Sequence, residues 1–374
     1  MKQKIFVHLF AAFLIAELMN KAEGHIGMKN KIDILNASSW NSVTAMFVLG
    51  DSSVDCGDNT PLYPLIHENL SLHPCNSSDG KLLPHLLAEK MNLPYTPPFY
   101  TRNGSLDGLI SGVNFGSALA TIMYSGTTSH QSLSQQLRQA FETIQLLQLE
   151  LGEETTERFV KSSLFYLSFG KDDYINYVLQ NSTDSSNSLN YGDEKFTYIL
   201  FHQMTNAIRN LYGANVRRII CVGVLPLGCS PHIRYWFNST EGEGTGCVDK
   251  VNKLVVEYNT RLEEKIVDLN VELPGAHIVF CDVYRAMMEF ITNPKNHGFE
   301  EAKNACCGIG KFGGMNGCLS TDMACYEASA HIWWDLYNPT QAVNSLLADS
   351  VWSGYPLSAI SRPLTIQELS QSSV

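Results

Sequence analysis

A short apolar run that ends in Gly-Asp-Ser most constrains how this chain can fold. Residues 45–49 are apolar or small and predict a buried strand, and Gly50 then allows a sharp turn that presents Asp51 and Ser52. Open α/β sheets place their sites at this end of the strands. A serine on such a turn has the geometry of a nucleophile, because its hydroxyl faces a crevice and free backbone N–H groups lie nearby to bind an oxyanion. The same triplet is also common in turns that carry no chemistry.

Apolar runs and amphipathic stretches alternate along the rest of the chain. Further buried strands are predicted at residues 163–169, 218–224 and 276–281, with a short one inside residues 109–123. Helices are predicted at residues 82–91, 131–151, 194–212, 247–270 and 283–292. This alternation predicts a parallel sheet covered on both faces, so the expected fold class is α/β.

Length and charge limit the classes of function. The 374 residues are enough for one elaborated α/β domain or for two domains. The formal net charge of −11 argues against a nucleic-acid or anionic-membrane surface, because phosphate groups require basic neutralisation. Small or neutral ligands are compatible with this composition.

Residues 1–24 have the pattern of a secretory signal peptide. A basic start at Lys2 and Lys4 is followed by an apolar run and then by small residues suited to cleavage. The run is too short for a membrane span, and no later stretch approaches that length, so integral membrane association is not expected. We expect an extracellular protein, and a vacuolar destination fits the same signal.

Six Asn-x-Ser/Thr sequons agree with secretion, because such sites are glycosylated only in the secretory pathway. N-linked glycans are therefore expected at Asn36, Asn69, Asn76, Asn103, Asn181 and Asn238.

The ten cysteines are expected to be partly paired in an oxidising compartment. Cys221 and Cys281 lie inside apolar runs and are expected to be buried thiols, while Cys56 and Cys75 lie early in the chain. The better disulfide candidates lie in glycine-rich loops, in a pairing that the sequence leaves open: Cys229, Cys247, Cys306, Cys307, Cys318 and Cys325. A zinc site is the weaker alternative, because residues 306–325 contain no histidine.

The string TAMFVLGDSSVDCGDN, residues 44–59, resembles the first sequence block of the plant GDSL esterase/lipase family, a branch of the SGNH hydrolase superfamily. In that family a strand runs into Gly-Asp-Ser and then Val-Asp-x-Gly-Asn-Asn. The matching positions here are Gly50, Asp51, Ser52, Val54, Asp55, Gly57, Asp58 and Asn59. The resemblance implies that Ser52 is the nucleophile and that its backbone N–H is an oxyanion donor.

The second family block, Ser-Asn/Asp-Gly-Arg, is matched less well by residues 78–81. On the resemblance, Gly80 would offer the second oxyanion N–H. The usual Gly-Arg-Phe lead-in is absent, and a plain turn before a helix explains Gly80 equally well.

The third block, Gly-x-Asn-Asp-Tyr, resembles residues 170–174, with Asp172 in place of the asparagine. In the family, that asparagine donates a side-chain N–H to the oxyanion. A carboxylate has no N–H, and when ionised it repels the charge that must be stabilised. Loss of one such donor costs on the order of a hundred- to a thousandfold in rate.

The last block, Trp-Asp-x-x-His-Pro-Thr, resembles residues 334–340, and on this resemblance Asp335 would be the aspartate of the triad. Asn338 stands where the family has the catalytic histidine. An asparagine cannot take a proton from a serine, and loss of a triad histidine costs on the order of a millionfold. His331 precedes the block and is expected to be a structural histidine.

Asp172 is itself a hypothetical replacement base. A carboxylate held close to Ser52 in a dry pocket could accept the serine proton if its pKa were raised. Two coupled departures, at positions 172 and 338, motivate this hypothesis.

The resemblance covers most of the chain and implies a flavodoxin-like three-layer α/β/α sandwich, with one domain over residues 25–374 that ends in a polar tail. It implies a secreted carboxylic ester hydrolase that acts on small-molecule or lipid acyl esters through Ser52, impaired by Asn338 and Asp172. An acyltransferase working through acyl-Ser52 is one alternative, and a non-catalytic protein that binds an ester, glycan or protein partner is another. No metal or organic cofactor is expected, because acyl transfer through serine requires neither.

Overall fold

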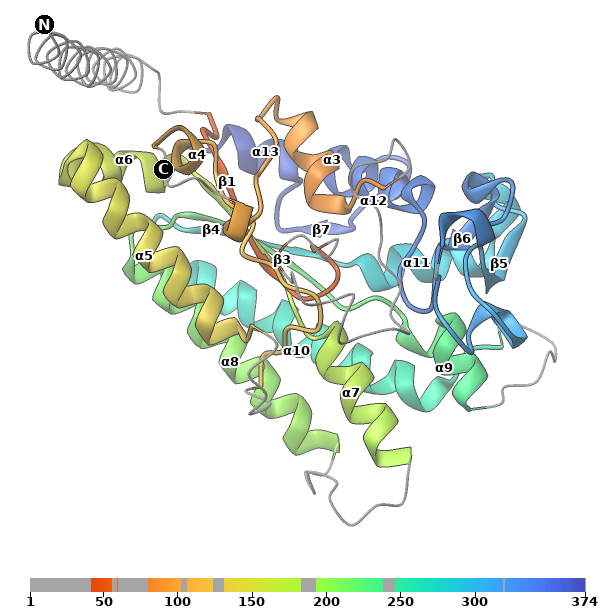
Figure 1. The fold of residues 1–374 in the computed structure, drawn as a ribbon. Coiled ribbons are helices and arrows are strands. Elements are labelled where there is room, and N and C mark those ends of the chain that lie inside the picture. Colours follow the sequence, from red (N-terminus) through yellow and green to blue (C-terminus); the bar gives the residue numbers. More distant parts are fainter. Residues whose placement is uncertain are drawn as a thin grey trace, which may run out of the picture.

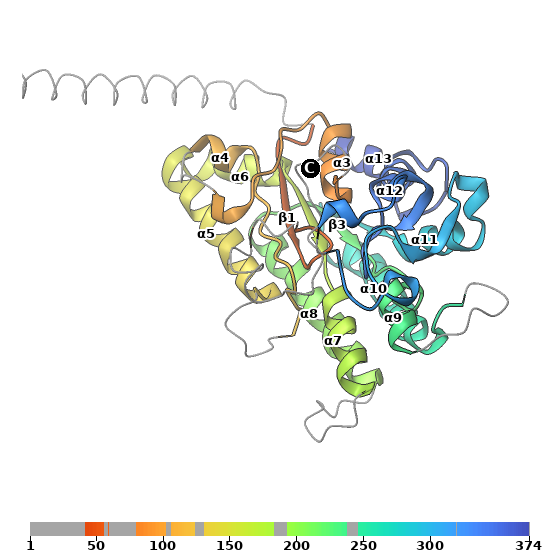
Figure 2. The same ribbon diagram turned by 45° about the vertical axis from the view of Figure 1, so that its right-hand side comes forward.

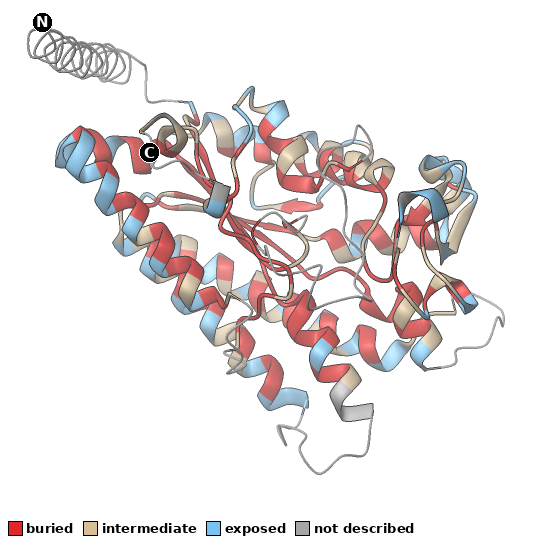
Figure 3. Ribbon diagram, viewed as in Figure 1, coloured by how far each residue is buried: buried red, intermediate tan, exposed pale blue. Residues whose placement is uncertain are grey.

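A computed structural model of the chain describes residues 42–55, 59, 80–101, 106–123, 131–182, 193–237, 246–318 and 320–373. Its centre is a sheet whose strands are buried (Figure 3). Four parallel strands lie side by side in chain order: β1 (Met46–Gly50), β2 (Leu164–Ser168), β3 (Arg218–Val222) and β4 (His277–Cys281). The two-residue strand β7 (Ser361–Arg362) pairs antiparallel with β4. Burial on both faces explains why the strand sequences are continuously apolar rather than alternating.

The other edge of β1 carries a single parallel bridge between Val48 and Asn114. The Val48 N–H donates to the Val113 carbonyl at 2.9 Å, and the Phe115 N–H donates to the Val48 carbonyl at 2.8 Å. This bridge stands in place of the strand predicted inside residues 109–123. The second extended segment of the chain thus lies beside the first, and the third, fourth and fifth follow on the other side, which is the flavodoxin-like order.

Helices cover both faces of the sheet (Figures 1 and 2). One layer contains α5 (Leu133–Leu151), α8 (Asp193–Gly213) and α10 (Asp249–Glu272). The other contains α3 (Leu83–Lys90), α11 (Val283–Thr292), α12 (Gln341–Ser353) and α13 (Ile366–Gln371). The predicted three-layer α/β fold is therefore confirmed.

Further α-helices lie between these elements along the chain. They are α4 (Leu106–Ile110), α6 (Glu153–Ser162), α7 (Lys171–Ser182) and α9 (Pro231–Trp236). The polar residues 181–188 predict a loop, but the first two of them belong to α7 and the others lie outside the described residues.

Among the described residues, three disulfides join loop cysteines: Cys229 to Cys247, Cys306 to Cys325, and Cys307 to Cys318. Cys221 and Cys281 are buried free thiols in β3 and β4, as expected from their apolar surroundings. Cys56 and Cys75 lie outside the described residues.

The last two disulfides close loops within a cysteine-rich segment, residues 306–325, and backbone hydrogen bonds join this segment to the chain that follows it. Strand β5 (Glu301–Ala305) pairs in parallel with β6 (His331–Trp333) in a small second sheet. The Cys306 N–H donates to the Trp333 carbonyl at 2.9 Å, and the Cys307 N–H donates to the Trp334 carbonyl at 2.7 Å. The segment that leads to Asp335 is thus hydrogen-bonded to two cysteines that disulfides fix in place.

Several expectations fall on parts of the chain that are not described. They are the signal peptide over residues 1–24 and the sequons at Asn36, Asn69, Asn76, Asn103 and Asn238. The sixth sequon, Asn181, is part of α7. None of the described helices combines the length and the apolar character that crossing a membrane requires.

Candidate active site

The carboxyl ends of β1 and β2 bring two turns together. Gly50 is level with Ser168 in the parallel register, and the Asp51 N–H donates to the Ser168 carbonyl at 3.0 Å. A Cβ on Gly50 would lie 2.7 Å from that carbonyl oxygen, so only glycine fits this position without a shift. The turn after β1 therefore presents Ser52 beside the turn that opens α7.

A glutamine side chain fixes the end of β1. Gln136, buried on α5, accepts the Gly50 N–H through Oε1 at 2.9 Å and donates Nε2–H to the Gly50 carbonyl at 2.9 Å. Its amide thus completes the hydrogen bonding of the residue that begins the turn.

The carboxylate of Asp51 links the two turns. Its Oδ1 accepts the Ser53 N–H at 2.9 Å, and its Oδ2 accepts the N–H groups of Lys171 and Asp172 at 2.9 and 3.4 Å. A carboxylate is favourable there, because the first N–H groups of a helix have no partners within the helix. Asp51 therefore sets the position of the first turn of α7 relative to Ser52.

Asp172 binds Ser52 through both of its oxygens. The Ser52 hydroxyl donates to Oδ1 at 2.6 Å, and the Ser52 backbone N–H donates to Oδ2 at 2.9 Å. Asp172 is buried, whereas Ser52 is partly exposed. The sequence therefore placed these two residues together correctly, although their roles stay a prediction.

A second group forms in the loop after β6. The Asn338 side chain donates Nδ2–H to Asp335 Oδ2 at 2.9 Å, and the Asn338 N–H donates to Asp335 Oδ1 at 2.8 Å. The other side-chain atom, Oδ1, accepts a hydrogen bond from Lys171 Nζ at 2.6 Å. Asp335 and Asn338 thus form a pair, and the pair is connected to α7 through Lys171.

Gly80 is buried just before α3. The neighbouring Lys81 N–H donates to Gln341 Oε1 on α12 at 2.7 Å. Within the described part of the chain, no hydrogen bond joins Gly80 to Ser52 or Asp172, so its oxyanion role stays a prediction.

Three carboxylates crowd this end of the sheet. Burial raises the pKa of Asp51 to about 6, helped by the Asp172 carboxylate and opposed by the Lys171 cation. Burial also raises the pKa of Asp173 to about 8, against the stabilising N–H groups of Ile122 and Met123, which lie 2.9 and 3.1 Å from its carboxylate oxygens. Asp173 is therefore mainly protonated at neutral pH.

The raised pKa of Asp173 predicts that stability falls between about pH 6.5 and pH 8. In the unfolded chain this carboxyl has a pKa near 3.8. Between about pH 6.5 and pH 8 the folded state therefore binds more protons than the unfolded state. Each pH unit then costs about 1.4 kcal/mol until the folded pKa is reached. We expect the free energy of unfolding, measured by urea denaturation, to decrease by about 2 kcal/mol.

His232 sets the lower limit of that range. Burial lowers the pKa of His232 from 6.5, so below that pH the unfolded state binds more protons at this residue than the folded state does. Its contribution to stability therefore falls as the pH is lowered, which is opposite to the effect of Asp173. Asp173→Asn should flatten the slope, whereas Asp349→Asn, at a surface carboxylate paired with Lys90, should leave it unchanged. An equal slope in the parent and in Asp173→Asn would contradict the assignment.

A cavity of about 60 Å³ lies beside these residues. Its walls are mainly apolar and come from α3, α11, α12 and the ends of β2 and β3, including Leu83, Met287 and Leu347. Lys171 and Asn338 are among its polar residues. One water needs about 10–15 Å³ of such space, so the cavity can hold a group of about four to six heavy atoms.

No histidine among the described residues hydrogen-bonds to Ser52 or Asp172. The His232 ring contacts Tyr337 at 5.3 Å between centroids, and its Nδ1 lies 2.7 Å from the Gly314 carbonyl. His331 begins β6, and its Nδ1 lies 3.1 Å from the Glu327 carbonyl. His331 is thus a structural histidine, as expected.

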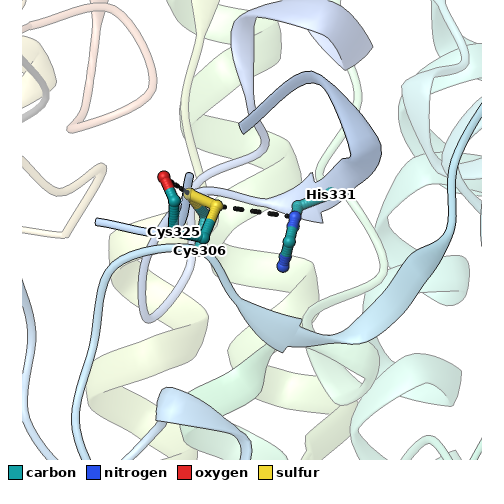
Figure 4. A group of neighbouring side chains, drawn as sticks. All are labelled: Cys306, Cys325 and His331. Atoms are coloured by element: carbon teal, nitrogen blue, oxygen red, sulfur yellow. Dashed lines mark hydrogen bonds between the residues drawn. A yellow bond between two sulfur atoms is a disulfide. The ribbon is translucent and has the colours of Figure 1, made fainter. Parts of the chain in front are cut away.

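His331 also lies beside the disulfide between Cys306 and Cys325 (Figure 4). Its Nδ1 is 3.5 Å from Cys325 Sγ, and the potential ligand atoms of the three residues lie within 4.8 Å of one another. The sequence argument against zinc missed this histidine, because it follows the cysteine segment. Both sulfurs are joined to each other, however, whereas a zinc ion requires them as thiolates.

Sequence reasoning also missed Lys171, which occupies the variable position of the third block. A lysine directly after a buried strand, at the start of a helix, is the signal that could have found it. Lysine is rarely buried without a partner.

The geometry agrees with comparisons to known proteins. The family model of GDSL-like lipase/acylhydrolase matches residues 46–351. One GDSL esterase/lipase of Arabidopsis thaliana is 33% identical over 342 residues, covering 87% of this chain and 89% of the relative. A second from the same plant is 31% identical over 344 residues and covers 87% of both chains. This chain therefore belongs to the family of GDSL-like lipases and acylhydrolases.

Proposed function

We propose that this protein is secreted, that it binds a short-chain carboxylic ester in the cavity lined by Asp51 and Ser53, the two chain neighbours of Ser52, and that its hydrolysis through Ser52 is severely impaired. The observation that carries this proposal is the double hydrogen bond between Asp172 and Ser52, at 2.6 Å to the hydroxyl and 2.9 Å to the N–H.

Hydrolysis by a serine requires both of these groups to be free for the substrate. The serine oxygen bonds to the ester carbon, its proton passes through a base to the leaving alcohol, and water later releases the acid. The carbonyl oxygen becomes negative and needs N–H donors. Asp172 Oδ2 accepts the Ser52 N–H that would serve this oxygen, and an ionised carboxylate would repel the new charge.

The second support is the group at position 338. A triad histidine would accept the serine proton, whereas the Asn338 amide has no basic nitrogen. Its Oδ1 is used by Lys171 and its Nδ2 by Asp335. The usual activation of Ser52 is therefore absent from this pair.

Secretion is supported by three disulfides among the described residues, because such bonds persist in oxidising compartments. The basic and apolar start of the chain and the six sequons point the same way.

One observation favours a second candidate, slow hydrolysis with Asp172 as the base. The 2.6 Å distance between Ser52 Oγ and Asp172 Oδ1 is suitable for proton transfer. In that case Asp172 would also have to release the Ser52 N–H as the oxyanion forms.

The test compares the parent protein with Ser52→Ala, using nitrophenyl acetate and butyrate hydrolysis and labelling by a fluorophosphonate probe. We expect equal, low hydrolysis in both proteins and no labelling of Ser52 in the parent. Hydrolysis and labelling that disappear in Ser52→Ala would overturn the proposed impairment. Loss of that activity in Asp172→Asn would then identify Asp172 as the base, and unchanged activity would exclude it.

Binding is tested separately by ligand-observed NMR with ethyl acetate, whose size matches the group that the cavity can hold. We expect the parent to bind it and Leu347→Trp, which fills the cavity from α12, to lose binding. Equal binding by both proteins would show that the ester does not enter this cavity.

A further inference from the structure

Lys171 is the unusual residue of this site. It is the first residue of α7, only 3% of its surface is exposed, and it lines the cavity. Among the described residues, Asn338 Oδ1 is the hydrogen-bond acceptor of its ammonium, at 2.6 Å. A buried cation with one neutral acceptor is costly, because an ammonium group has three N–H donors to satisfy.

Lys171 binds the side chain of Asn338, the residue that stands in place of the histidine of the family pattern. Asn338 donates Nδ2–H to Asp335, as a triad histidine would donate to its aspartate. The far side of the carboxamide then accepts from Lys171, whereas a triad histidine would turn its far nitrogen toward the serine. The chain of hydrogen bonds from Asp335 therefore ends on α7 at Lys171 and not at Ser52.

We infer that Lys171 is a positioning residue, whose ammonium holds the side chain at position 338 against Asp335 and directs it away from Ser52. This inference rests on the proposed function, because it explains how the impaired arrangement is held. Residues 171, 172 and 338 then act as one unit: the lysine fixes the asparagine, and the aspartate fixes the serine.

The inference has a consequence for Asn338→His. An imidazole extends further from the backbone than a carboxamide, so the introduced ring would meet the Lys171 ammonium. Like charges in a buried site disfavour the protonated ring. The carboxylates of Asp335, Asp172 and Asp51 act in the opposite direction, because they favour the protonated ring. The His232 ring packs against Tyr337, the residue before position 338. All of these other groups stay the same when only Lys171 is changed.

The test measures the pKa of the introduced imidazole by NMR titration, which requires no activity. The proteins are Asn338→His alone, Asn338→His with Lys171→Met, and Asn338→His with Lys161→Met. Methionine keeps most of the lysine volume and removes the charge. Lys161 pairs with Glu157 on α6, which precedes β2 and so lies at the other end of the sheet from the site, and it provides the matched control.

We expect Lys171→Met to raise the imidazole pKa by about one unit or more, and Lys161→Met to leave it within a few tenths. In the same series, Lys171→Met should raise fluorophosphonate labelling of Ser52 by about tenfold or more at neutral pH, because the ring is freed to face the serine. An imidazole pKa and a labelling rate unaffected by Lys171→Met would overturn the inference. A failure of the proposed function gives a different result, because the parent protein would then show hydrolysis that depends on Ser52.

Discussion

Asp172→Asn combined with Asn338→His is expected to raise kcat/KM for a short-chain nitrophenyl ester by on the order of a thousandfold or more over the parent. The asparagine frees the Ser52 N–H and adds a side-chain N–H for the oxyanion, in place of the bonds that Asp172 now makes. The histidine adds a base beside Asp335. The gain should persist with Lys171 present and increase further with Lys171→Met.

Single variants separate the two effects. With Asn338→His alone the oxyanion donor is still occupied, and with Asp172→Asn alone the base is still absent, so each should gain far less than the pair. Asn344→His combined with Asp172→Asn is the matched control, because Asn344 lines the same cavity and binds the Lys81 carbonyl instead of Asp335. A pair no better than its better single variant would show that the two positions do not act together.

Gln136→Met is expected to lower the free energy of unfolding by about 3 kcal/mol. The substitution leaves the buried Gly50 N–H without its acceptor, and among the described residues the Gly50 carbonyl then keeps the Ser117 N–H at 3.1 Å. An unsatisfied buried donor costs about 1–3 kcal/mol, in addition to the lost hydrogen bond. Urea denaturation at constant pH measures the change.

Gln139→Met, one turn further along α5, is the control. Gln139 is also buried, but its Oε1 has no hydrogen-bond partner among the described residues, and its Nε2 makes only a 3.4 Å bond to Tyr100. Its replacement should change stability by less than about 1 kcal/mol, because little is lost. Equal losses in the two variants would show that burial of an amide, not its pairing with Gly50, decides the effect.

Much of the fold could be predicted because its core elements carry strong patterns. The helix expected at residues 283–292 has the observed bounds of α11, and the apolar runs after residues 163 and 276 became β2 and β4. Because parallel strands end at the same edge, the sequence could also predict that Ser52 lies near Asp172.

Elements outside the core were not predictable in this way. Strand β5 has the sequence Glu-Ala-Lys-Asn-Ala and is only partly buried, so it shows no apolar run. Helix α6 was also missed, because most of its first residues are polar.

The charge pattern of the site was the least predictable part. Sequence identifies Asp172 and Asn338 as departures, but it does not show which way their side chains turn. The contact of Lys171 with Asn338 joins residues separated by 167 positions, and no local pattern predicts it. The same holds for Asp173, whose partners Ile122 and Met123 come from a different segment.

The link between the cysteine-rich segment and the loop of Asp335 bears on how the protein should be produced. Cys306 and Cys307 contact Trp333 and Trp334 directly before that loop, and each also forms a disulfide. Protein made in a reducing bacterial cytoplasm, or assayed with dithiothreitol, would lack these bonds. Inactivity of such a sample could not be assigned to Asn338, because the missing disulfides would also explain it. The protein should therefore be expressed through an oxidising secretory route before its activity is measured.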